Sequence, residues 1–325
     1  MKPTASTSNI AIIGGGVAGM SCALWLKHLG LTPIIIEQNA KLGGQLLHLN
    51  RVNRWVLGYF DKTSTELAGI YVDHIEKENI QVFCRSRLLN ITANLNGYDV
   101  SFDVEGNLQS LSTRALVIAT GVRVLSHEIF GKIPGFQSIY DNGLISFYPI
   151  AHLDYLPTLK GKTIAVIGGG DNAYYTAKDV ALAGAYVYLL SRSNPKARST
   201  VRQEVVALIE NKIISVRTGV ELKQFRQHQN GVEITFIGVG SEPEQINVNM
   251  VFARTGFAAN SEFLDAFEAF SGLNKESGYI KTDSAKCTSI PWLYAVGDVA
   301  NAKHQSVVNA IAEGAIAAQG ISEQL

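Results

Sequence analysis

Two glycine-rich stretches are the residues of this chain best suited to hold a charged ligand. The first is Gly14–Gly16 with Gly19 close behind it, and the second is Gly168–Gly170. Each follows a short apolar run that predicts a buried strand, and each precedes a segment with helical spacing. Glycines allow a tight turn there, and the amides at the start of the helix bind phosphate groups. The sequence therefore predicts two dinucleotide sites in one chain, which suggests redox traffic between two dinucleotides.

The residue that ends the strand after each glycine turn indicates which ribose the site accepts. In the first copy this residue is Glu37, whose carboxylate is placed to accept hydrogen bonds from the hydroxyls of an unphosphorylated ribose. The first site therefore suits FAD or NAD better than NADP. In the second copy the equivalent residue is Ser191, which is compatible with a 2′-phosphate, and Arg192 and Arg198 are placed to pair with that phosphate.

Length and charge restrict the class of protein. The chain has 325 residues, enough for about two domains of ~150 residues each. Lys plus Arg and Asp plus Glu number 28 each, so no excess charge points to nucleic acid or to a membrane surface. No apolar stretch approaches the ~20 residues of a membrane span. The polar start, Met1–Asn9, does not resemble a signal peptide and there are only three cysteines, so we expect a cytoplasmic protein.

The elements that must position these residues follow from periodicity and turn signals. We expect helices at about 18–29, at about 65–78 and from about 306, and strands at 9–13, 32–37, 80–84, 115–118, 164–167 and 186–190. One complete strand–turn–helix unit lies within the other along the chain. We therefore predict an α/β fold with two Rossmann-like dinucleotide-binding domains, the second inserted into the first. The first spans 1–125 plus 258–325, and the inserted second domain spans 126–257.

The order of the motifs resembles that of the low-molecular-weight thioredoxin reductases over nearly the whole chain. Between the two glycine turns stand Gly43–Leu46 and Ala119–Gly121, and Val296–Asp298 follows the second turn, as in that family. The set as a whole is specific, although each motif alone is not. The resemblance implies an FAD domain, an inserted pyridine-nucleotide domain and a homodimer.

The resemblance also implies which residues contact FAD. They are Gly14, Gly16, Ala18, Gly19, Glu37, Gln38, Gly44, Gln45, Asn53, Val82, Ala119, Thr120, Gly121, Asp298, Gln305 and Ser306. In the family's pattern Asp298 would bond the ribityl chain, and Gln305 with the amides after it would lie near the flavin N1–O2 edge. A helix N-terminus there would stabilise the negative charge of reduced flavin. The stretch from Arg51 to Trp55 resembles a flavin-contacting segment, although Arg54 stands where the family has asparagine.

The second site departs further from the family. Its implied contacts are Gly168, Gly170, Asp171, Asn172, Ala173, Arg192 and Arg198. The family's NADPH signature has a histidine and two consecutive arginines, whereas this chain reads Ser191-Arg192-Ser193. Two tyrosines, Tyr174 and Tyr175, stand where acidic residues commonly follow the fingerprint, and they either stack on a ring system or pack the helix. We expect NADPH here rather than a second FAD.

The family's redox dithiol is missing from this chain. Thioredoxin reductases carry Cys-x-x-Cys just before the second fingerprint, where this chain reads Ile145–His152 without a cysteine. The cysteines are Cys22, Cys84 and Cys287, and no two are neighbours in the sequence. Ordinary thioredoxin reductase activity by disulfide exchange is therefore rejected.

Aromatic residues occupy the place of the dithiol. Phe147-Tyr148 resembles the pattern of thioredoxin-reductase-like ferredoxin–NADP reductases, which also lack the cysteine pair, but the tail around His304 resembles the thioredoxin reductases. Tyr148 is a candidate to cover the flavin face, and His304 is a candidate to donate a proton to the flavin or tune its potential. His127, His152 and His304 are not spaced as metal ligands, so no metal is expected.

The sequence therefore predicts an FAD-dependent oxidoreductase that passes electrons between FAD and a nicotinamide or a protein carrier such as ferredoxin, without a redox disulfide. Two alternatives remain open. One is a diflavin or ferredoxin-linked relative with a second flavin in the NADPH-type pocket. The other is a non-catalytic flavin-binding regulatory protein.

Overall fold

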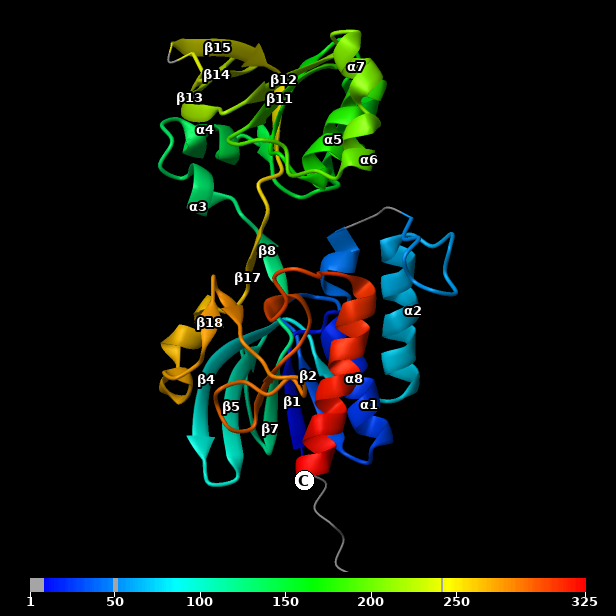
Figure 1. Cartoon of the computed structure of the whole chain (residues 1–325). Coiled ribbons are helices and arrows are strands. Elements are labelled where there is room, and N and C mark those ends of the chain that lie inside the picture. Colours follow the sequence, from blue (N-terminus) through cyan, green and yellow to red (C-terminus); the bar gives the residue numbers. More distant parts are fainter. Residues whose placement is uncertain (1–8, 49–51, 241) are drawn as a thin grey trace, which may run out of the picture. The chain divides into compact units, whose positions relative to one another are not determined.

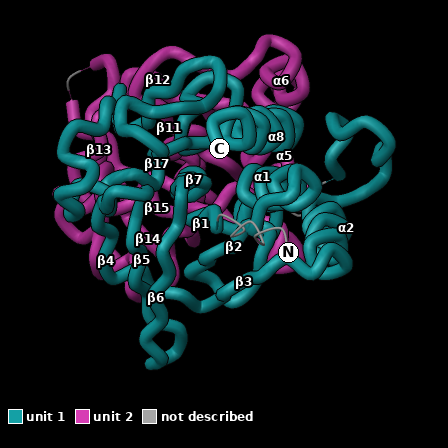
Figure 2. The backbone as a smooth tube through the Cα atoms, turned by 90° about the horizontal axis from the view of Figure 1, so that it is seen from below, with its two compact units in different colours: residues 1–123, 258–325 teal, residues 124–257 magenta. Residues whose placement is uncertain are grey.

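The chain forms two compact units, shown in different colours in Figure 2. The structure, a computed structural model, describes residues 9–48, 52–240 and 242–325. Unit 1 comprises Met1–Arg123 and Ala258–Leu325, and unit 2 comprises Val124–Phe257. The first boundary lies two residues before the one predicted from the sequence, because it falls within strand β8 (Val122–Val124). Strand β8 is hydrogen-bonded to β17 (Phe257–Ala259), in which the chain returns to unit 1.

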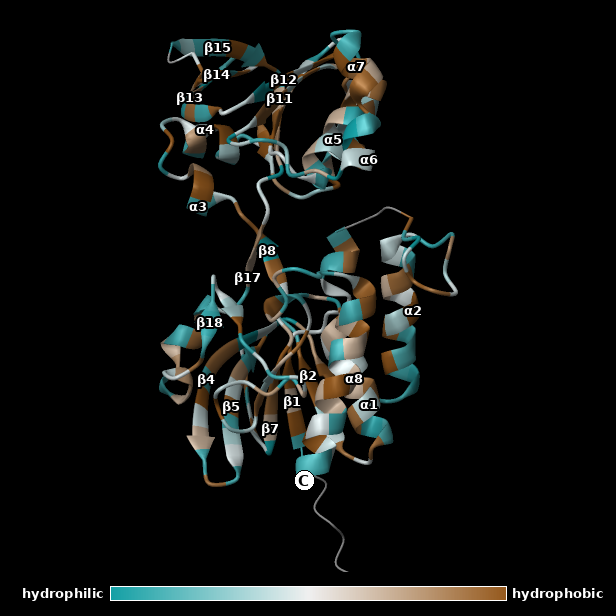
Figure 3. Ribbon diagram, viewed as in Figure 1, coloured by the Kyte–Doolittle hydropathy of each residue, from teal (hydrophilic) through white to brown (hydrophobic). Residues whose placement is uncertain are grey.

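A five-stranded parallel sheet forms the centre of unit 1 (Figure 1). In spatial order its strands are β20 (Leu293–Ala295), β7 (Ala115–Ile118), β1 (Asn9–Ile13), β2 (Thr32–Ile36) and β3 (Gln81–Phe83). All neighbouring pairs run parallel. The strands are nearly continuous apolar runs, as expected for a sheet covered on both faces, and are largely brown in Figure 3.

Alternate residues of β1 serve the two faces of this sheet. Ile10 and Ile12 pack on the side covered by helices, whereas Ala11 and Ile13 pack on the side covered by an antiparallel meander. The helices are α1 (Val17–His28), α2 (Ser64–Lys77) and α8 (Val307–Gln324), and the meander is β4 (Ser86–Asn94), β5 (Gly97–Val104) and β6 (Asn107–Thr113). The short elements of unit 1 are η1 (Gly44–His48), η3 (Glu262–Ala266), η4 (Glu268–Phe270), β18 (Lys275–Glu276), β19 (Tyr279–Ile280) and η5 (Gly297–Val299).

Unit 2 repeats this plan. Its parallel sheet has the order β12 (Ile214–Thr218), β11 (Tyr186–Ser191), β10 (Thr163–Ile167), β16 (Met250–Ala253) and β9 (Ile145–Ser146). Helix α5 (Asp171–Leu182) covers one face, and a meander covers the other. The meander is β13 (Glu221–His228), β14 (Gly231–Ile237) and β15 (Pro243–Val248). The remaining elements are α3 (His127–Phe130), α4 (Phe136–Asp141), η2 (Ala151–Thr158), α6 (Ser199–Gln203) and α7 (Val206–Glu210). Two parallel sheets with helical and meander layers confirm the predicted fold class.

Helices α1 and α8 lie side by side with their backbones in close approach (Figure 1). A Cβ atom at Gly314 would collide with the carbonyl oxygen of Ala18 and lie 2.7 Å from the amide nitrogen of Cys22. The hydroxyl of Ser21 donates a hydrogen bond to the carbonyl of Ile311 at 2.7 Å. A side chain at position 314 would therefore push apart the helix that follows the first glycine turn and the helix that supports it.

We predict that Gly314→Ala lowers the free energy of unfolding of unit 1 by about 2 kcal/mol, because its Cβ would meet backbone atoms that cannot rotate away. Gly69→Ala in α2 is the matched control, because nothing lies within 4 Å of a Cβ there, and it should stabilise by up to about 1 kcal/mol. Urea unfolding followed by tryptophan fluorescence tests both, since Trp25, Trp55 and Trp292 all belong to unit 1. Equal midpoints for the two variants would contradict the close packing.

Candidate functional site

The first glycine turn joins β1 to α1 at the carboxyl end of the sheet. Gly14 has a φ of +111°, and a Cβ there would lie 2.5 Å from the carbonyl oxygen of Ala119. The Gly14 amide donates to Ile36 at 2.9 Å, and the Ala119 amide donates to Ile13 at 2.8 Å. A Cβ at Gly19 would collide with the Gly14 carbonyl. Only glycine at both positions lets the helix start this close to the strand ends.

The helices after the two glycine turns begin without a side-chain cap. Gly16 caps α1 and Gly170 caps α5, and neither offers a side-chain acceptor to the first amides. By contrast, Thr63 caps α2 and Ser306 caps α8 with side-chain hydrogen bonds. The first amides of α1 and α5 therefore keep donors and a positive dipole end for a phosphate.

Glu37 lies directly beside the first turn. Its Oε2 accepts a hydrogen bond from the amide of Gly15 at 2.7 Å, and its Oε1 accepts from the amide and the side chain of Asn39 at 2.7 and 2.8 Å. The side chain is buried. Because a carboxylate has about four acceptor positions, this one is held in place and keeps room for a further donor such as a ribose hydroxyl. Gln38, the next residue, is exposed.

The second predicted glycine pair closes over the first turn. The Gly43 amide donates to the carbonyl of Gly15 at 2.9 Å, and a Cβ at Gly44 would lie 3.0 Å from the Cα of Gly16. Gly44 has a φ of +53°. Next in the chain, Gln45 donates from Nε2 to the carbonyl of Val122 at 2.6 Å. The predicted residues Gly14, Gly16 and Gly44 therefore do lie together.

The turn after β7 is fastened to the segment that returns from unit 2. Thr120 donates from Oγ1 to the carbonyl of Asn260 at 2.6 Å, and Asn260 donates from Nδ2 to the carbonyl of Thr120 at 3.0 Å. The Asn260 amide also donates to the carbonyl of Gly121 at 2.9 Å. Hydrogen bonds to Asn260 thus hold the Ala119–Gly121 turn in place.

Asp298 lies in η5, at the end of β20. Burial, and to a smaller extent the neighbouring Glu313 carboxylate, raises the pKa of Asp298 from 3.8 to about 6. Gln305 donates from Nε2 to the hydroxyl of Tyr279 at 3.3 Å. Ser306 accepts the Asn309 amide on its Oγ at 3.2 Å, so the first turn of α8 already has one side-chain cap.

The other residues predicted for the first site have structural partners of their own. Asn53 accepts the Trp55 amide at 3.0 Å within an exposed loop, whereas Arg51, which begins the predicted flavin-contacting stretch, lies outside the described residues. Val82 packs against the helix-side core, and Ala18 lies in the first turn of α1 against Gly297. His304 is exposed, and its carbonyl accepts a hydrogen bond from the Asn309 side chain at 2.6 Å.

The second glycine turn repeats the backbone contacts of the first. Gly168 has a φ of +150°, and a Cβ there would collide with the carbonyl oxygen of Arg254. The Gly168 amide donates to Leu190 at 2.8 Å. The carbonyl of Gly169 accepts the amides of Lys196 and Ala197 at 2.8 and 3.0 Å, so the loop after β11 folds back onto the turn.

The arginines predicted to meet a 2′-phosphate differ in their surroundings. Arg198 donates from its amide and from Nε to the carboxylate of Asp171, at 2.8 and 2.6 Å. The guanidinium is therefore engaged with the first residue of α5 rather than extended toward a ligand. Arg192 is exposed, and Ser191 is buried with its hydroxyl donating to the carbonyl of Ser193 at 2.9 Å.

The residues predicted at the start of helix α5 differ in whether they are buried or exposed. Ala173 and Tyr174 are buried in the core between α5 and the sheet, so Tyr174 packs the helix, whereas Asn172 is exposed.

Tyr148 is half-exposed after β9, while its neighbour Phe147 is buried in an aromatic cluster with Phe130.

The three cysteines are free and all lie in unit 1. Burial raises the pKa of the Cys22 thiol, and burial together with the Glu37 carboxylate raises that of Cys84. Neither environment favours a thiolate. Among the described residues no group of three or more His, Cys, Asp or Glu is arranged to hold a metal ion. No helix in the described ranges is long and apolar enough to cross a membrane.

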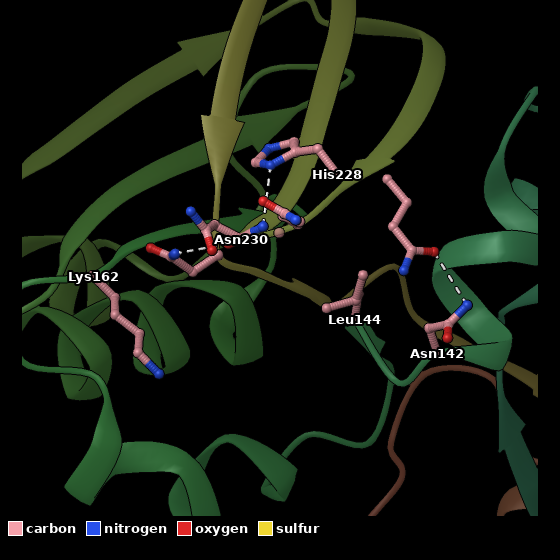
Figure 4. A pocket seen from close by; sticks show the side chains of 9 residues that line it. Asn142, Leu144, Lys162, His228 and Asn230 are labelled. Atoms are coloured by element: carbon pink, nitrogen blue, oxygen red, sulfur yellow. Dashed lines mark hydrogen bonds between the residues drawn. The ribbon is translucent and has the colours of Figure 1, made fainter.

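A polar hollow of about 320 Å³ opens in unit 2 (Figure 4). Leu144 precedes β9 and Lys162 precedes β10, so the hollow lies at the N-terminal ends of these strands. Two of its amide side chains are bonded to each other, because Asn142 donates from Nδ2 to Oε1 of Gln227 at 3.1 Å. Open parallel sheets bind ligands at the carboxyl ends of their strands, so this hollow is not the dinucleotide site.

Three residues that sequence reasoning did not select take part in the first site. Asn39 and Asn260 hold Glu37 and the Thr120 turn, and both lie in loops whose sequences carry no signal for this role. Glu313 accepts the amide of Gly297, next to Asp298, at 2.7 Å. An acidic residue on the apolar face of the predicted C-terminal helix was the available signal for it.

Comparison with known proteins agrees with this geometry. The sequence model of a family described as pyridine nucleotide-disulphide oxidoreductase matches residues 8–314. An alkyl hydroperoxide reductase subunit of Pseudomonas aeruginosa is 26% identical over 322 residues, which cover 98% of this chain. The chain spans only 58% of that relative's length.

Solved structures are similar over almost the whole fold. Thioredoxin reductase of Lactococcus lactis has a TM-score of 0.80 and 22% identity, covering 98% of both chains. The bacillithiol disulfide reductase of Bacillus cereus has a TM-score of 0.79 and 19% identity, covering 98% of this chain and 99% of its own. At these identities the likeness shows the fold.

We predict that Asp298→Asn stabilises the flavin-free protein at pH 7.5 by about 1–2 kcal/mol. Because the pKa of Asp298 is raised in the folded state, the stability given by the neutral carboxyl is present below pH 3.8 and is lost as the pH rises through 6. The advantage of the variant should therefore shrink toward pH 4. Urea unfolding by tryptophan fluorescence at both pH values measures it, with Asp73→Asn on α2 as a charge control. An equal advantage at both pH values would contradict the raised pKa.

Proposed function

Because the chain belongs to the pyridine nucleotide-disulphide oxidoreductase family, we propose that this thioredoxin reductase-like flavoprotein moves electrons between FAD and a nicotinamide or protein carrier without a redox disulfide. FAD is assigned to unit 1 and a nicotinamide dinucleotide, NADPH before NADH or a second FAD, to unit 2.

The observation that carries the proposal is the pair of glycine turns. Each follows the central strand of a five-stranded parallel sheet and opens onto a helix without a side-chain cap. A backbone cradle of this kind suits a pyrophosphate, because the amides and the helix dipole supply the positive end and no Cβ blocks the approach. Two cradles in one chain support electron transfer between two dinucleotides.

The residues of unit 1 fit FAD. Gly14, Gly16 and Gly44 lie close together without side chains, and Glu37 stands beside the turn to receive a ribose. Asp298 is available to the ribityl chain, and the N-terminal end of α8 would favour negative charge on the ring system. FAD, when bound, supplies hydride chemistry in which two electrons and a proton arrive together and the electrons leave to a second carrier.

The cysteines of this chain do not favour a disulfide relay, which supports direct electron transfer between the flavin and an external partner. Cys22 lies in α1, Cys84 lies between β3 and β4, and Cys287 lies in the loop before β20; the thiol pKa values of Cys22 and Cys84 are raised. A disulfide relay needs two thiols that can meet and at least one accessible thiolate. An external carrier, such as ferredoxin, is therefore proposed as the other electron partner.

In unit 2 the proposal of NADPH rests on Ser191 and Arg192, because the strand end lacks a carboxylate that would repel a 2′-phosphate. Arg198 would have to exchange Asp171 for the phosphate to contribute. If NADPH fails to react, this cost favours the two alternatives that the sequence left open, a diflavin or ferredoxin-linked relative and a non-catalytic flavin-binding regulatory protein.

We predict rapid, stoichiometric loss of oxidised-flavin absorbance when the purified protein is titrated anaerobically with NADPH. NADH in place of NADPH is the matched control for the 2′-phosphate. Reduction by dithionite or reduced ferredoxin alone, with two flavins extracted per chain, would replace the proposal by the diflavin alternative. A flavin that no biological donor reduces would favour the regulatory alternative.

We predict that Gly14→Val abolishes flavin retention, because its Cβ would press on the Ala119 carbonyl and its φ of +111° is unfavourable for valine. Gly106→Ala, in an open turn of the meander at a φ of +89°, controls for a strained glycine away from the cradle. The ratio of flavin to protein absorbance measures retention. A yellow Gly14→Val protein would disprove the assignment of the first site.

A further inference from the structure

One carboxylate is buried on the sheet-facing side of α8. Glu313 is 7% exposed and stands between Ala310 and Ala317 on the apolar face of the helix. A carboxylate in such surroundings is costly unless it is paired and fully hydrogen-bonded. The partners of Glu313 therefore indicate the role of its carboxylate.

Glu313 has three partners from three different segments. Its Oε2 accepts the buried amide of Gly297 at 2.7 Å, and its Oε1 accepts Nδ2 of Asn301 at 3.1 Å. The ammonium of Lys286 lies 3.1 Å from Oε1, and both side chains of this ion pair are largely buried. Lys286 sits in a turn with a φ of +67°, and its carbonyl accepts the Ala295 amide at 3.1 Å, so its backbone is fixed as well.

These partners connect the two segments that the proposed flavin site uses. Gly297 begins η5 and precedes Asp298. Asn301 accepts the amides of Lys303 and His304 on its Oδ1, at 3.2 and 2.9 Å. The carbonyl of His304 in turn accepts Nδ2 of Asn309, in the first turn of α8. A chain of hydrogen bonds therefore runs from the Glu313 carboxylate to both η5 and the start of α8.

We propose that Glu313, neutralised by Lys286, is a positioning residue that holds η5 and the N-terminal end of α8 in register and balances the charge beside the flavin ring system. The inference rests on the proposed binding of FAD in unit 1. It adds a pair of residues, of which Glu313 contacts η5 and Lys286 contacts Glu313, and neither is proposed to contact the ligand.

Removing Lys286 and removing the Glu313 charge change the net charge beside the proposed flavin site in opposite directions. With Lys286 present, the Glu313 charge is compensated next to Asp298, whose own pKa the Glu313 carboxylate helps to raise. Without Lys286, an uncompensated negative charge faces the site and opposes negative charge on reduced flavin. Without the Glu313 charge, the Lys286 ammonium favours it. The two single variants should therefore shift the flavin midpoint potential in opposite directions.

The test uses the full-length protein with Lys286→Met, Glu313→Gln and the double variant. The dissociation constant for FAD is measured on deflavinated protein, and the midpoint potential is measured on the holoprotein by equilibration with a redox dye. Lys281→Met and Glu276→Gln break an exposed ion pair of the same unit and serve as matched controls. Neither control should change either quantity, because exposed pairs contribute little.

We expect Lys286→Met to weaken FAD binding by about tenfold or more and to make the potential more negative. Glu313→Gln keeps an oxygen for the Gly297 amide, so it should weaken FAD binding less and make the potential more positive. The double variant should return the potential toward that of the wild type. A merely structural role would lower stability without opposite shifts of potential.

FAD dissociation constants within twofold of wild type and unmoved potentials in both single variants would overturn the inference. If neither single variant folds, Asn301→Ala decides, because it cuts the link to α8 without changing any charge: unchanged FAD affinity overturns the inference, and weakened affinity supports it. A wild-type protein that binds no FAD would instead disprove the proposed function, so the two failures are distinguishable.

Discussion

The structure depends on one steric constraint, the contact between backbones at each glycine turn. At Gly14 a Cβ would lie 2.5 Å from the carbonyl oxygen of the strand-end residue Ala119, and at Gly168 it would collide with the equivalent oxygen of Arg254. This contact lets the following helix begin directly over the carboxyl ends of the strands. The free amides of the helix therefore point toward the edge of the sheet where a ligand would bind. In each sheet the turn follows the central strand, so strands lie on both sides of that contact.

The two units satisfy this constraint with different polar surroundings. In unit 1 a buried carboxylate, Glu37, faces the turn, and a second glycine pair closes over it. In unit 2 a serine replaces the carboxylate, and the closing loop carries Arg198, which pairs with Asp171. A duplicated backbone plan therefore presents an acidic rim in one unit and a compensated ion pair in the other. This asymmetry is the physical basis for assigning different ligands to the two turns.

Local features of the fold were predictable from the sequence, whereas the polar contacts of the site were not. Apolar runs such as Ile10–Ile13 and the glycines after them determine strand, turn and helix through neighbouring residues alone, so the sequence predicted the parallel α/β plan. The Arg198 interpretation was incomplete, because the pairing with Asp171 depends on how the loop after β11 folds back. The partners of Glu313, Lys286 and Gly297, were not predictable, because they are distant from it in the sequence and meet it only in the folded unit. Such groups respond to tertiary neighbours that no periodicity encodes.

The packing of α8 on α1 has a consequence for biosynthesis. Helix α1 follows the first glycine turn, but the glycine that lets α8 approach it, Gly314, is translated only after the whole of unit 2. Unit 2 is continuous in the chain and can fold as soon as it leaves the ribosome, whereas the nascent unit 1 exposes the apolar face that α8 will cover. The N-terminal part of unit 1 is therefore made before unit 2 but becomes native only after α8 has been made, and the proposed flavin site is complete only from that point.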